Sequence, residues 1–408
     1  MGSLVAVRLP PGAAFLAAWD RIWSAGDALL PLPHDAPDAV VARTIEELAP
    51  AALVVPLPGH PDRTRVVRLE GGRDVPAGIA LVVATSGTTG EPKGVLLSHD
   101  AITASVAASI ERLEISRASA WLSCLPWHHV AGLLTVLRSR ASGGVAVVQP
   151  GFGVEAVRRD LDRVGWTSLV PTQLVRLLDA DVRLGALDGI LLGGAAAPVT
   201  LVDRARAAGA RVVVSYGMTE TCGGCVYDGV PLAGVTVGID GEGRILVHGP
   251  VLADGYRDGR SGRVEPLEPI RTLSADGTER VEDQPGDGWF ATEDLGVIEN
   301  GRLLVLGRRD DVIVTGGENV SATAVRDRLN EHPSVQDAAV TGLPDPEWGT
   351  VVVAAVTCGA ATPSVEELRA HVAEALGPHA APRRLAFVDA IPRTALGKPD
   401  LIGLQKIF

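Results

Sequence analysis

The segment Thr85–Gly94, which reads TSGTTGEPKG, constrains the fold of this chain more than any other. It follows an apolar run, Ile79–Val83, and precedes a helix-like segment, Asp100–Arg112. Glycines permit a tight turn that exposes backbone N–H groups, and the hydroxyls and Lys93 add donors and a positive charge. The pattern therefore predicts a polyphosphate-binding loop between a strand and a helix, in preference to a flexible linker. It is not a Walker A loop, because the Gly-Lys-Ser/Thr ending is missing.

Composition limits the classes of protein to consider. A chain of 408 residues predicts two or three folded units. Its net charge of −12 argues against nucleic acid or an anionic membrane surface as a partner. We expect neither a membrane helix nor a signal peptide, since no run is apolar enough for either. The four cysteines are too few for a disulfide framework, so a cytoplasmic location is expected.

Two of the cysteines, Cys222 and Cys225, form a C-x-x-C pattern with two glycines between them. A structural zinc site needs two more ligands, and Cys124 and Cys358 are not paired in the sequence. A redox dithiol usually opens a helix after a strand. We favour a third interpretation, in which these are small residues packed beside a pocket.

Short apolar runs alternate with helical patterns over the first half of the chain. This alternation predicts an α/β fold with parallel strands and crossover helices. The expected strands are Ala80–Ala84, Val145–Val148, Gly189–Leu192 and Arg211–Val214, and the expected helices include Val154–Val164 and Pro198–Ala208.

The pattern changes near Val235, where short strands among glycine-rich turns predict a small β-rich subdomain extending to about Val305. Within it, the polar segment Arg260–Asp287 is expected to be a surface loop. Beyond Gly307 a third unit is predicted. Its expected elements are a helix at Ala322–Asn330, strands at Val335–Gly342 and Thr350–Thr357, and a helix at Ser364–Leu376.

Four further segments carry chemistry-bearing residues in turns. They are SYGMTET (Ser215–Thr221), GWFATEDLG (Gly288–Gly296), GRRDDVIVTGGENV (Gly307–Val320) and PRTALGK (Pro392–Lys398). Each alone is compatible with an ordinary turn, solvated face or surface loop. Together with the glycine-rich loop and in this order, they resemble the adenylate-forming superfamily of acyl-CoA synthetases, luciferases and peptide-synthetase adenylation domains.

The resemblance implies an ATP site. The residues it assigns to ATP are Thr85, Ser86, Gly87, Thr88, Thr89, Gly90, Lys93, Gly194, Ala195, Tyr216, Gly217, Met218, Asp294 and Arg308. Among them, Tyr216 would stack on adenine, and Asp294 and Arg308 would bind the ribose. Thr219 and Lys398 would contact the α-phosphate as catalytic residues, and Glu220 would be both a catalytic residue and the Mg²⁺ ligand.

The resemblance also implies the domain organisation. A large N-terminal adenylation domain, residues 1–307, would have a shortened N-terminus, mixed and parallel sheets, and a β-rich subdomain at about 235–307. A small mobile α+β C-terminal domain, residues 308–408, would rotate about Asp310.

Physical chemistry agrees with these implied roles. Adenylation joins two anions, a carboxylate and a triphosphate, so its barrier is largely electrostatic and positional. Mg²⁺ neutralises the leaving pyrophosphate, and a lysine point charge can follow the phosphorus as its charge rises. No side-chain nucleophile is needed, and no G-x-S-x-G elbow is present.

A narrower resemblance concerns the acid. The short N-terminus, LPWHHVAGL (Leu125–Leu133), VPTQLVRLL (Val170–Leu178) and YGMTETCGGCVYDG (Tyr216–Gly229) resemble the short actinobacterial type of 2-succinylbenzoate–CoA ligase, a family of menaquinone biosynthesis. The implied small-molecule partners are this acid, ATP and coenzyme A. The acyl-pocket residues so assigned are His129, Gly193, Ser215, Gly217 and Gly223.

The benzoate carboxylate would need a polar or cationic partner, for which Gln173 and Arg176 are candidates. A helix-surface role is the stronger interpretation for Arg176, as packing is for His128. Another aryl- or medium-chain acyl-CoA ligase, a carrier-protein-loading enzyme and a non-catalytic nucleotide-binding module are the alternatives. The oligomeric state stays open, with a homodimer as one option.

Overall fold

A computed structural model describes residues 1–86, 92–116, 119–261, 263–264, 270–282, 286–309, 312–316, 318–359, 361–393 and 399–408. Six predicted site residues lie outside this part of the chain, namely Gly87, Thr88, Thr89, Gly90, Asp310 and Lys398. The chain divides into two compact units. The first comprises Met1–Gly238, Leu246–Ala291 and Ile298–Leu303, and the second comprises Ile239–Ile245, Thr292–Val297 and Leu304–Phe408. The predicted division near residue 307 and the pivot at Asp310 stay predictions.

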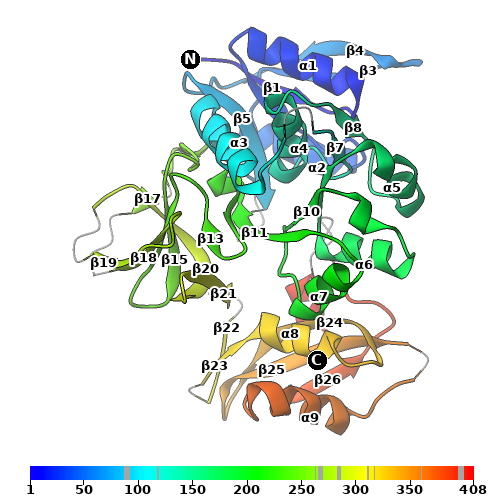
Figure 1. The fold of residues 1–408 in the computed structure, drawn as a ribbon, viewed down its shortest axis with the longest axis vertical. Coiled ribbons are helices and arrows are strands. Elements are labelled where there is room, and N and C mark those ends of the chain that lie inside the picture. The colour runs from blue at the N-terminus through cyan, green and yellow to red at the C-terminus, as the bar shows by residue number, and fades with distance from the viewer. Residues whose placement is uncertain are drawn as a thin grey trace. The chain divides into compact units, whose positions relative to one another are not determined.

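The first sheet has the strand order β16-β6-β5-β2-β1-β3-β4. Its strands β1, β3, β4 and β5 are labelled in Figure 1. Strands β5, β2, β1 and β3 are parallel neighbours, whereas β4, β6 and β16 are antiparallel additions. The strand bounds are β1 Leu4–Val7, β2 Ala28–Pro31, β3 Ala52–Leu57, β4 His60–Arg68, β5 Ile79–Ser86, β6 Pro92–Ser98 and β16 Gly255–Tyr256.

Successive side chains of a strand point to opposite faces of a sheet, so neighbouring residues can pack in two different cores. Helices cover both faces of this sheet. Val83 and Leu97 face one core with the helices α1 (Ala13–Ser24), α3 (His99–Leu113) and α4 (Val130–Ala141). Val82 and Leu96 face the other core with α2 (Asp38–Leu48). The predicted strand Ala80–Ala84 and helix Asp100–Arg112 are thereby confirmed, each with slightly wider bounds.

The second sheet has the order β13-β12-β11-β10-β9-β7-β8. Its parallel strands are β7 Trp121–Ser123, β8 Ala146–Val148, β9 Trp166–Leu169, β10 Gly189–Leu192 and β11 Val212–Met218, and its antiparallel strands are β12 Gly223–Tyr227 and β13 Val230–Pro231. Three helices cover one of its faces, α5 Val154–Asp160, α6 Pro171–Asp179 and α7 Val199–Ala207. This βα alternation is the one that the sequence predicted.

The β-rich segment forms a third sheet of order β17-β20-β15-β14-β18-β19, with β21 paired to β20. Its strands are β14 Thr236–Ile239, β15 Arg244–His248, β17 Arg263–Val264, β18 Ile270–Ser274, β19 Glu279–Glu282, β20 Trp289–Glu299 and β21 Arg302–Arg308. The prediction that Arg260–Asp287 is a surface loop is therefore wrong in part, since β17, β18 and β19 lie within this segment. Ile270 and Leu273 are fully buried, and their burial outweighs the polar composition around them.

The second unit contains a hairpin, β22 Val312–Thr315 and β23 Glu318–Ser321, and a three-stranded sheet of order β24-β25-β26. The sheet strands are Val335–Asp345, Gly349–Cys358 and Arg384–Phe387, and the helices are α8 Ala322–Asn330, α9 Val365–Leu376 and α10 Leu401–Gln405. A capping box between Ser364 and Glu367 begins α9. Val325 and Leu368 pack on the sheet from the two longer helices. All four elements predicted for this region are confirmed.

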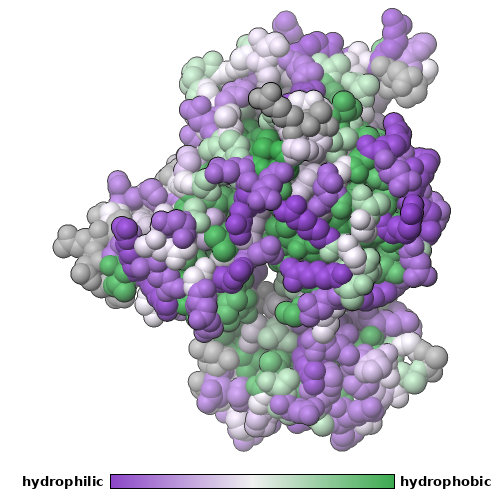
Figure 2. All heavy atoms as spheres, in the orientation of Figure 1, coloured by the Kyte–Doolittle hydropathy of each residue, from purple (hydrophilic) through white to green (hydrophobic). Residues whose placement is uncertain are grey.

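Hydrophilic residues cover much of the face shown in Figure 2. In the described part of the chain, no helix is both long and apolar enough to cross a lipid bilayer.

One arginine joins three segments of the first unit. The backbone N–H of Arg257 donates to Gly94 O at 2.7 Å, which aligns it beside β6. Its guanidinium donates to Leu48 O at 3.1 Å, where α2 ends, and also to the carbonyls of Arg73 and Asp74. Burial lowers the pKa of this guanidinium. Carbonyl oxygens thus replace part of the water that the half-buried guanidinium has lost.

We expect Arg257→Met to lower the free energy of unfolding by about 2–4 kcal/mol, since it leaves several carbonyls without their donor. Urea denaturation followed by tryptophan fluorescence measures the change. The control is Arg183→Met, because the Arg183 side chain is 83% exposed and only 3.8 Å from an equally solvated Asp162. That control should change the free energy by no more than about 0.5 kcal/mol. Equal effects of the two substitutions would contradict the bridging role of Arg257.

Candidate functional site

The predicted residues of the second sheet gather at the carboxyl ends of its parallel strands. Strands β9, β10 and β11 end at Leu169, Leu192 and Met218, and the N–H of Gly193 donates to Leu169 O at 3.1 Å. In an open α/β sheet, ligands bind at this edge. The residues it brings together are Gly193, Gly194 and Ala195 after β10, and Ser215, Tyr216, Gly217 and Met218 at the end of β11.

Gly217 explains why this edge needs glycine. Its φ is +157°, and a Cβ placed there would lie 2.1 Å from Gly223 O on the paired strand β12. The register of the pair also shifts between Tyr216 and Gly217. A side chain at this position would separate β11 from β12. The pairing that places Tyr216 near the end of β11 and Thr219 just after it therefore depends on glycine at position 217.

The glycine-rich segment connects two antiparallel strands, β5 and β6, rather than a strand and a helix directly. Thr85 pairs with Lys93 in their register, and Thr85 Oγ1 donates to Lys93 O at 3.5 Å. The sequence analysis missed β6, because Pro92 and Gly94 are unfavourable in strands. The consequence is that Lys93 stands on a paired strand at the base of the predicted phosphate loop.

Glu220 lies in a short 3₁₀ turn, Thr219–Thr221, that directly follows β11. The hydroxyl of Tyr256 donates to Glu220 Oε1 at 3.0 Å, and the backbone oxygen of Glu220 accepts from Ala253 N at 2.8 Å. Burial, followed by the charge of Glu220, raises the pKa of Tyr256, so the phenol keeps its proton and remains a donor. Sequence reasoning missed Tyr256, since no motif marks it.

The surroundings of Glu220 fit a magnesium ion. Mg²⁺ is usually held by one or two carboxylates together with substrate phosphates and waters, not by a dedicated protein cage. Among the described residues, no group of three or more His, Cys, Asp or Glu side chains could hold a metal. One carboxylate oxygen of Glu220 accepts from Tyr256, and we find no second partner of this carboxylate in the described part of the chain. A single carboxylate with an oxygen left for a metal is a donor of the kind that binds Mg²⁺ together with the phosphates of ATP.

The predicted acyl-pocket histidine, His129, is exposed at the N-terminus of α4. Ser123 Oγ fixes the loop before it by accepting hydrogen bonds from Trp127 Nε1 at 2.9 Å and Thr135 Oγ1 at 2.7 Å. His128 is half-buried, and burial together with His129 lowers the pKa of His128 to about 4. His128 is therefore neutral near pH 7 and packs against the His129 ring, as the sequence analysis favoured.

Sequence reasoning missed Arg138, a fully buried cation. Its side chain is 2% exposed; Nε donates to Ser109 Oγ at 2.8 Å, Nη2 donates to Tyr227 Oη at 3.3 Å, and Cζ lies 5.5 Å from the Trp121 ring centre. No carboxylate partner of Arg138 is found among the described residues. A signal was present in the sequence, because Arg138 follows Leu134 by four residues and so falls on the buried face of α4.

Gln173 and Arg176, the candidates that the sequence suggested for the benzoate carboxylate, lie on helix α6. Arg176 is exposed on α6. Gln173 Oε1 accepts from Val170 N at 3.1 Å and so caps its own helix.

Asp294 and Arg308 belong to the second unit. Asp294 is half-buried on β20, where its N–H donates to Thr292 Oγ1 at 3.0 Å, and Arg308 is exposed at the end of β21. Their predicted contacts with ribose stay predictions, as do the roles of Asp310 and Lys398.

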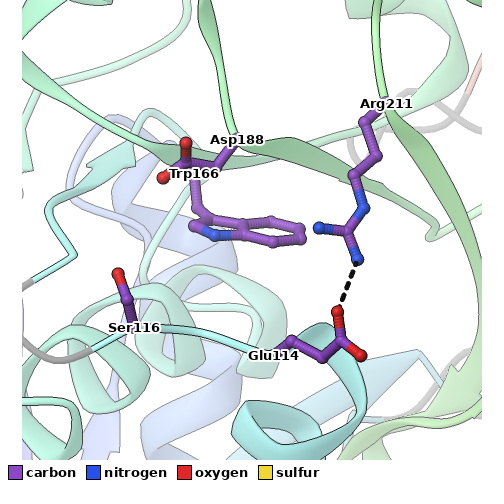
Figure 3. Close-up of a pocket in the computed structure, with 5 residues that line it drawn as sticks. All are labelled: Glu114, Ser116, Trp166, Asp188 and Arg211. Carbon is purple, nitrogen blue, oxygen red and sulfur yellow. Dashed lines mark ion pairs between the residues drawn. The ribbon is translucent and has the colours of Figure 1, made fainter.

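A surface pocket of about 270 Å³ lies at the opposite edge of the second sheet (Figure 3). Trp166, Asp188 and Arg211 line it from the amino ends of β9, β10 and β11. The Arg211 guanidinium lies 5.3 Å from the Trp166 ring centre and 4.0 Å from Glu114 (Figure 3). The Arg211 side chain thus covers the ring of Trp166. None of the predicted site residues that the structure describes lines this pocket.

The C-x-x-C pattern is a packing feature. Cys222 and Cys225 are free thiols with 0% exposure, and burial raises the pKa of each to about 12. Ser105 Oγ donates to the backbone oxygen of Cys222 at 2.9 Å. Buried, protonated thiols are neither metal ligands nor nucleophiles.

Comparison with known families matches both parts of the chain. The family described as AMP-binding enzyme matches residues 1–257. The family described as AMP-binding enzyme C-terminal domain matches residues 325–398.

Individual relatives are similar over nearly the whole chain. A Mycobacterium tuberculosis protein named "Probable 2-succinylbenzoate--CoA ligase" is 42% identical, over 88% of this chain and 91% of its own length. The Bacillus subtilis o-succinylbenzoate CoA synthetase in complex with the acyl-adenylate intermediate OSB-AMP has a TM-score of 0.82 and 28% identity, with 98% of this chain and 87% of that one covered. The same enzyme in complex with ATP and magnesium ion gives a TM-score of 0.82 and 27% identity, covering 98% and 88%.

The thiols provide a test of the packing interpretation. Burial raises the pKa of Cys124 to about 11, and those of Cys222 and Cys225 to about 12, so all three thiols stay protonated at pH 8. The same burial keeps a reagent from reaching them. Only Cys358 is partly exposed. We expect a disulfide reagent at pH 8 to label at most one thiol per native chain and four after denaturation, and Cys358→Ser to abolish the native signal. Rapid labelling of two thiols after treatment with a zinc chelator would instead indicate a metal site.

Proposed function

This chain belongs to the family of AMP-binding enzymes, and on that premise we propose that it is an AMP-forming ligase of 2-succinylbenzoate and coenzyme A. The observation that carries this proposal is the 42% identity, over 88% of the chain, to the mycobacterial protein of that name. The product, 2-succinylbenzoyl-CoA, would serve menaquinone biosynthesis.

The reaction has two steps. In the first, a carboxylate oxygen of the acid attacks the α-phosphorus of ATP, and the bond to pyrophosphate breaks. In the second, the thiol of coenzyme A loses its proton to solvent as its sulfur attacks the acyl carbon, and AMP leaves with the electron pair of the acyl–oxygen bond. Both steps depend on position and charge rather than on a side-chain nucleophile.

Described residues of the first unit are suited to the nucleotide. Lys93, held on β6, supplies positive charge beside the predicted phosphate loop. Tyr216 offers a ring at the sheet edge, and Thr219 offers a hydroxyl at the start of the turn that carries Glu220. Bound at Glu220, magnesium would supply positive charge against the leaving pyrophosphate. A homodimeric assembly and a cytoplasmic location remain predictions.

A release assay for pyrophosphate tests the proposed function. The acids compared are 2-succinylbenzoate, benzoate and octanoate, each with and without coenzyme A. We expect ATP- and Mg²⁺-dependent release with 2-succinylbenzoate, and thioester formation only when coenzyme A is added. Preference for benzoate or octanoate would favour another acyl-CoA ligase, whereas no release with any acid would favour a non-catalytic nucleotide-binding module.

The acid itself makes a second demand, because it carries a benzoate carboxylate in addition to the carboxylate that reacts. Burying that second anion without a partner is costly. We infer that Arg138 is the partner. Its guanidinium is buried among neutral groups, and we find no carboxylate beside it in the described part of the chain. A buried cation of this kind gains most from an anion that arrives with the substrate.

Contacts connect Arg138 to the predicted acyl pocket. Tyr227, which accepts from Arg138, lies on β12 two residues after the C-x-x-C pattern. A Cβ on Gly224 would come within 2.8 Å of the Tyr227 ring and 2.0 Å of Ser215 Oγ. Gly224 therefore leaves no room for a side chain of its own between Ser215 and Tyr227.

Arg138→Lys and Arg138→Met test this inference with two substrates, 2-succinylbenzoate and 4-oxo-4-phenylbutanoate, which lacks the ortho carboxylate. The native enzyme should prefer the diacid by at least about tenfold in kcat/KM, since the analogue leaves a buried charge unpaired. Arg138→Met should lose that preference, and Arg138→Lys should keep part of it. Circular dichroism and thermal melting report whether each variant folds.

The matched control is Arg140→Met on the same helix, whose guanidinium pairs with Asp20 at the surface. It should leave the preference for the diacid intact. An unchanged preference in a folded Arg138→Met variant would assign the benzoate carboxylate to another residue, while leaving the adenylation chemistry untouched.

A further inference from the structure

Tyr256 occupies a fixed position beside the strand that carries Lys93. It pairs with Val95 in the register of β16 and β6, and its neighbour Gly255 pairs with Leu96. The hydrogen bond from Asp254 N to Leu96 O, at 2.9 Å, continues the alignment on one side, and the Arg257 anchor continues it on the other. The backbone of Tyr256 is therefore held in register with β6.

The side chain of Tyr256 is also restrained. Arg260 Cζ lies 5.4 Å from the centre of its ring, and Arg260 O accepts from Tyr256 N at 2.8 Å. Asp258 holds the Arg260 guanidinium through a 2.5 Å ion pair. The ring of Tyr256 is thus fixed on one face by a cation, which favours a single direction for its hydroxyl.

The hydroxyl of Tyr256 donates a hydrogen bond to Glu220 Oε1 at 3.0 Å. A glutamate side chain has three rotatable bonds, and an unrestrained one would spend much of its time in orientations that cannot reach a metal. Ala253 N fixes the backbone of Glu220, and Tyr256 fixes its carboxylate. Both restraints come from the same segment, which is hydrogen-bonded to β6.

We propose that Tyr256 is a positioning residue, which holds the carboxylate of Glu220 in the orientation that binds the magnesium of MgATP. The proposal rests on the proposed function, in which Glu220 is the metal ligand. It assigns to the segment Ala253–Arg257 the task of setting the metal carboxylate relative to the strand that carries Lys93. In this role Tyr256 acts through its hydrogen bond to Glu220 and not by direct contact with the metal or the nucleotide.

The test is Tyr256→Phe, which removes one oxygen and keeps the ring. Isothermal titration of ATP at a series of Mg²⁺ concentrations measures binding without turnover. We expect the Mg²⁺ concentration for half-maximal enhancement of ATP binding to rise about tenfold, as the loss of a charge-assisted hydrogen bond implies. ATP binding without Mg²⁺, the thermal melting temperature and kcat at saturating Mg²⁺ should each stay close to the native values.

A double-mutant cycle with Glu220→Gln shows whether Tyr256 acts through Glu220. In the Glu220→Gln background, Tyr256→Phe should have no further effect on the Mg²⁺ dependence. Equal effects in both backgrounds, or an equal loss of ATP binding without Mg²⁺, would overturn the positioning role. A native protein that binds MgATP and releases pyrophosphate, together with a Tyr256→Phe variant of unchanged Mg²⁺ dependence, would overturn this proposal alone. A native protein that does neither would overturn the proposed function.

Discussion

The hydrogen bonds of the short segment Ala253–Arg257 hold the candidate site together. On one side this segment pairs with β6, the strand that leaves the predicted phosphate loop, and on the other it binds Glu220 at the end of β11. Strands β6 and β11 belong to different sheets, so no strand pairing among the described residues relates them directly. The positive charge of Lys93 and the negative charge of Glu220 are thereby placed by one continuous piece of backbone.

The interior of the first unit contains a second constraint, the buried charge of Arg138, for which we find no carboxylate partner in the described part of the chain. Burying an ion costs several kcal/mol even after its surroundings relax. Two hydroxyls and the face of Trp121 offset part of that cost, but none of them carries a negative charge. Stability alone would be served better by an apolar residue at this position of α4. This cost is the reason to propose a bound anion as the partner of Arg138.

The sequence predicted the parallel strands, their helices and the elements of the second unit, because burial periodicity is a local signal. It also predicted the edge at which Tyr216 and Thr219 lie, since the ends of parallel strands meet by topology. It could not predict Tyr256 or Arg138, whose importance lies in contacts between segments far apart in the chain. The error in the loop prediction for Arg260–Asp287 has a related cause. The segment is polar overall, but a few buried residues in it are enough to form the hairpin of β18 and β19.

A substrate with two carboxylates poses a problem of selection, since either could attack ATP. On the proposed function, the two ends of the acyl pocket solve it by their electrostatics. A carboxylate held by Arg138 is paired in a dry interior, where its charge is neutralised and its nucleophilicity is low. The other carboxylate would be directed toward the sheet edge of Ser215 and Thr219, where the α-phosphate is predicted to bind. On this proposal, burial of one arginine decides which bond can form, with no contact to the reacting atoms.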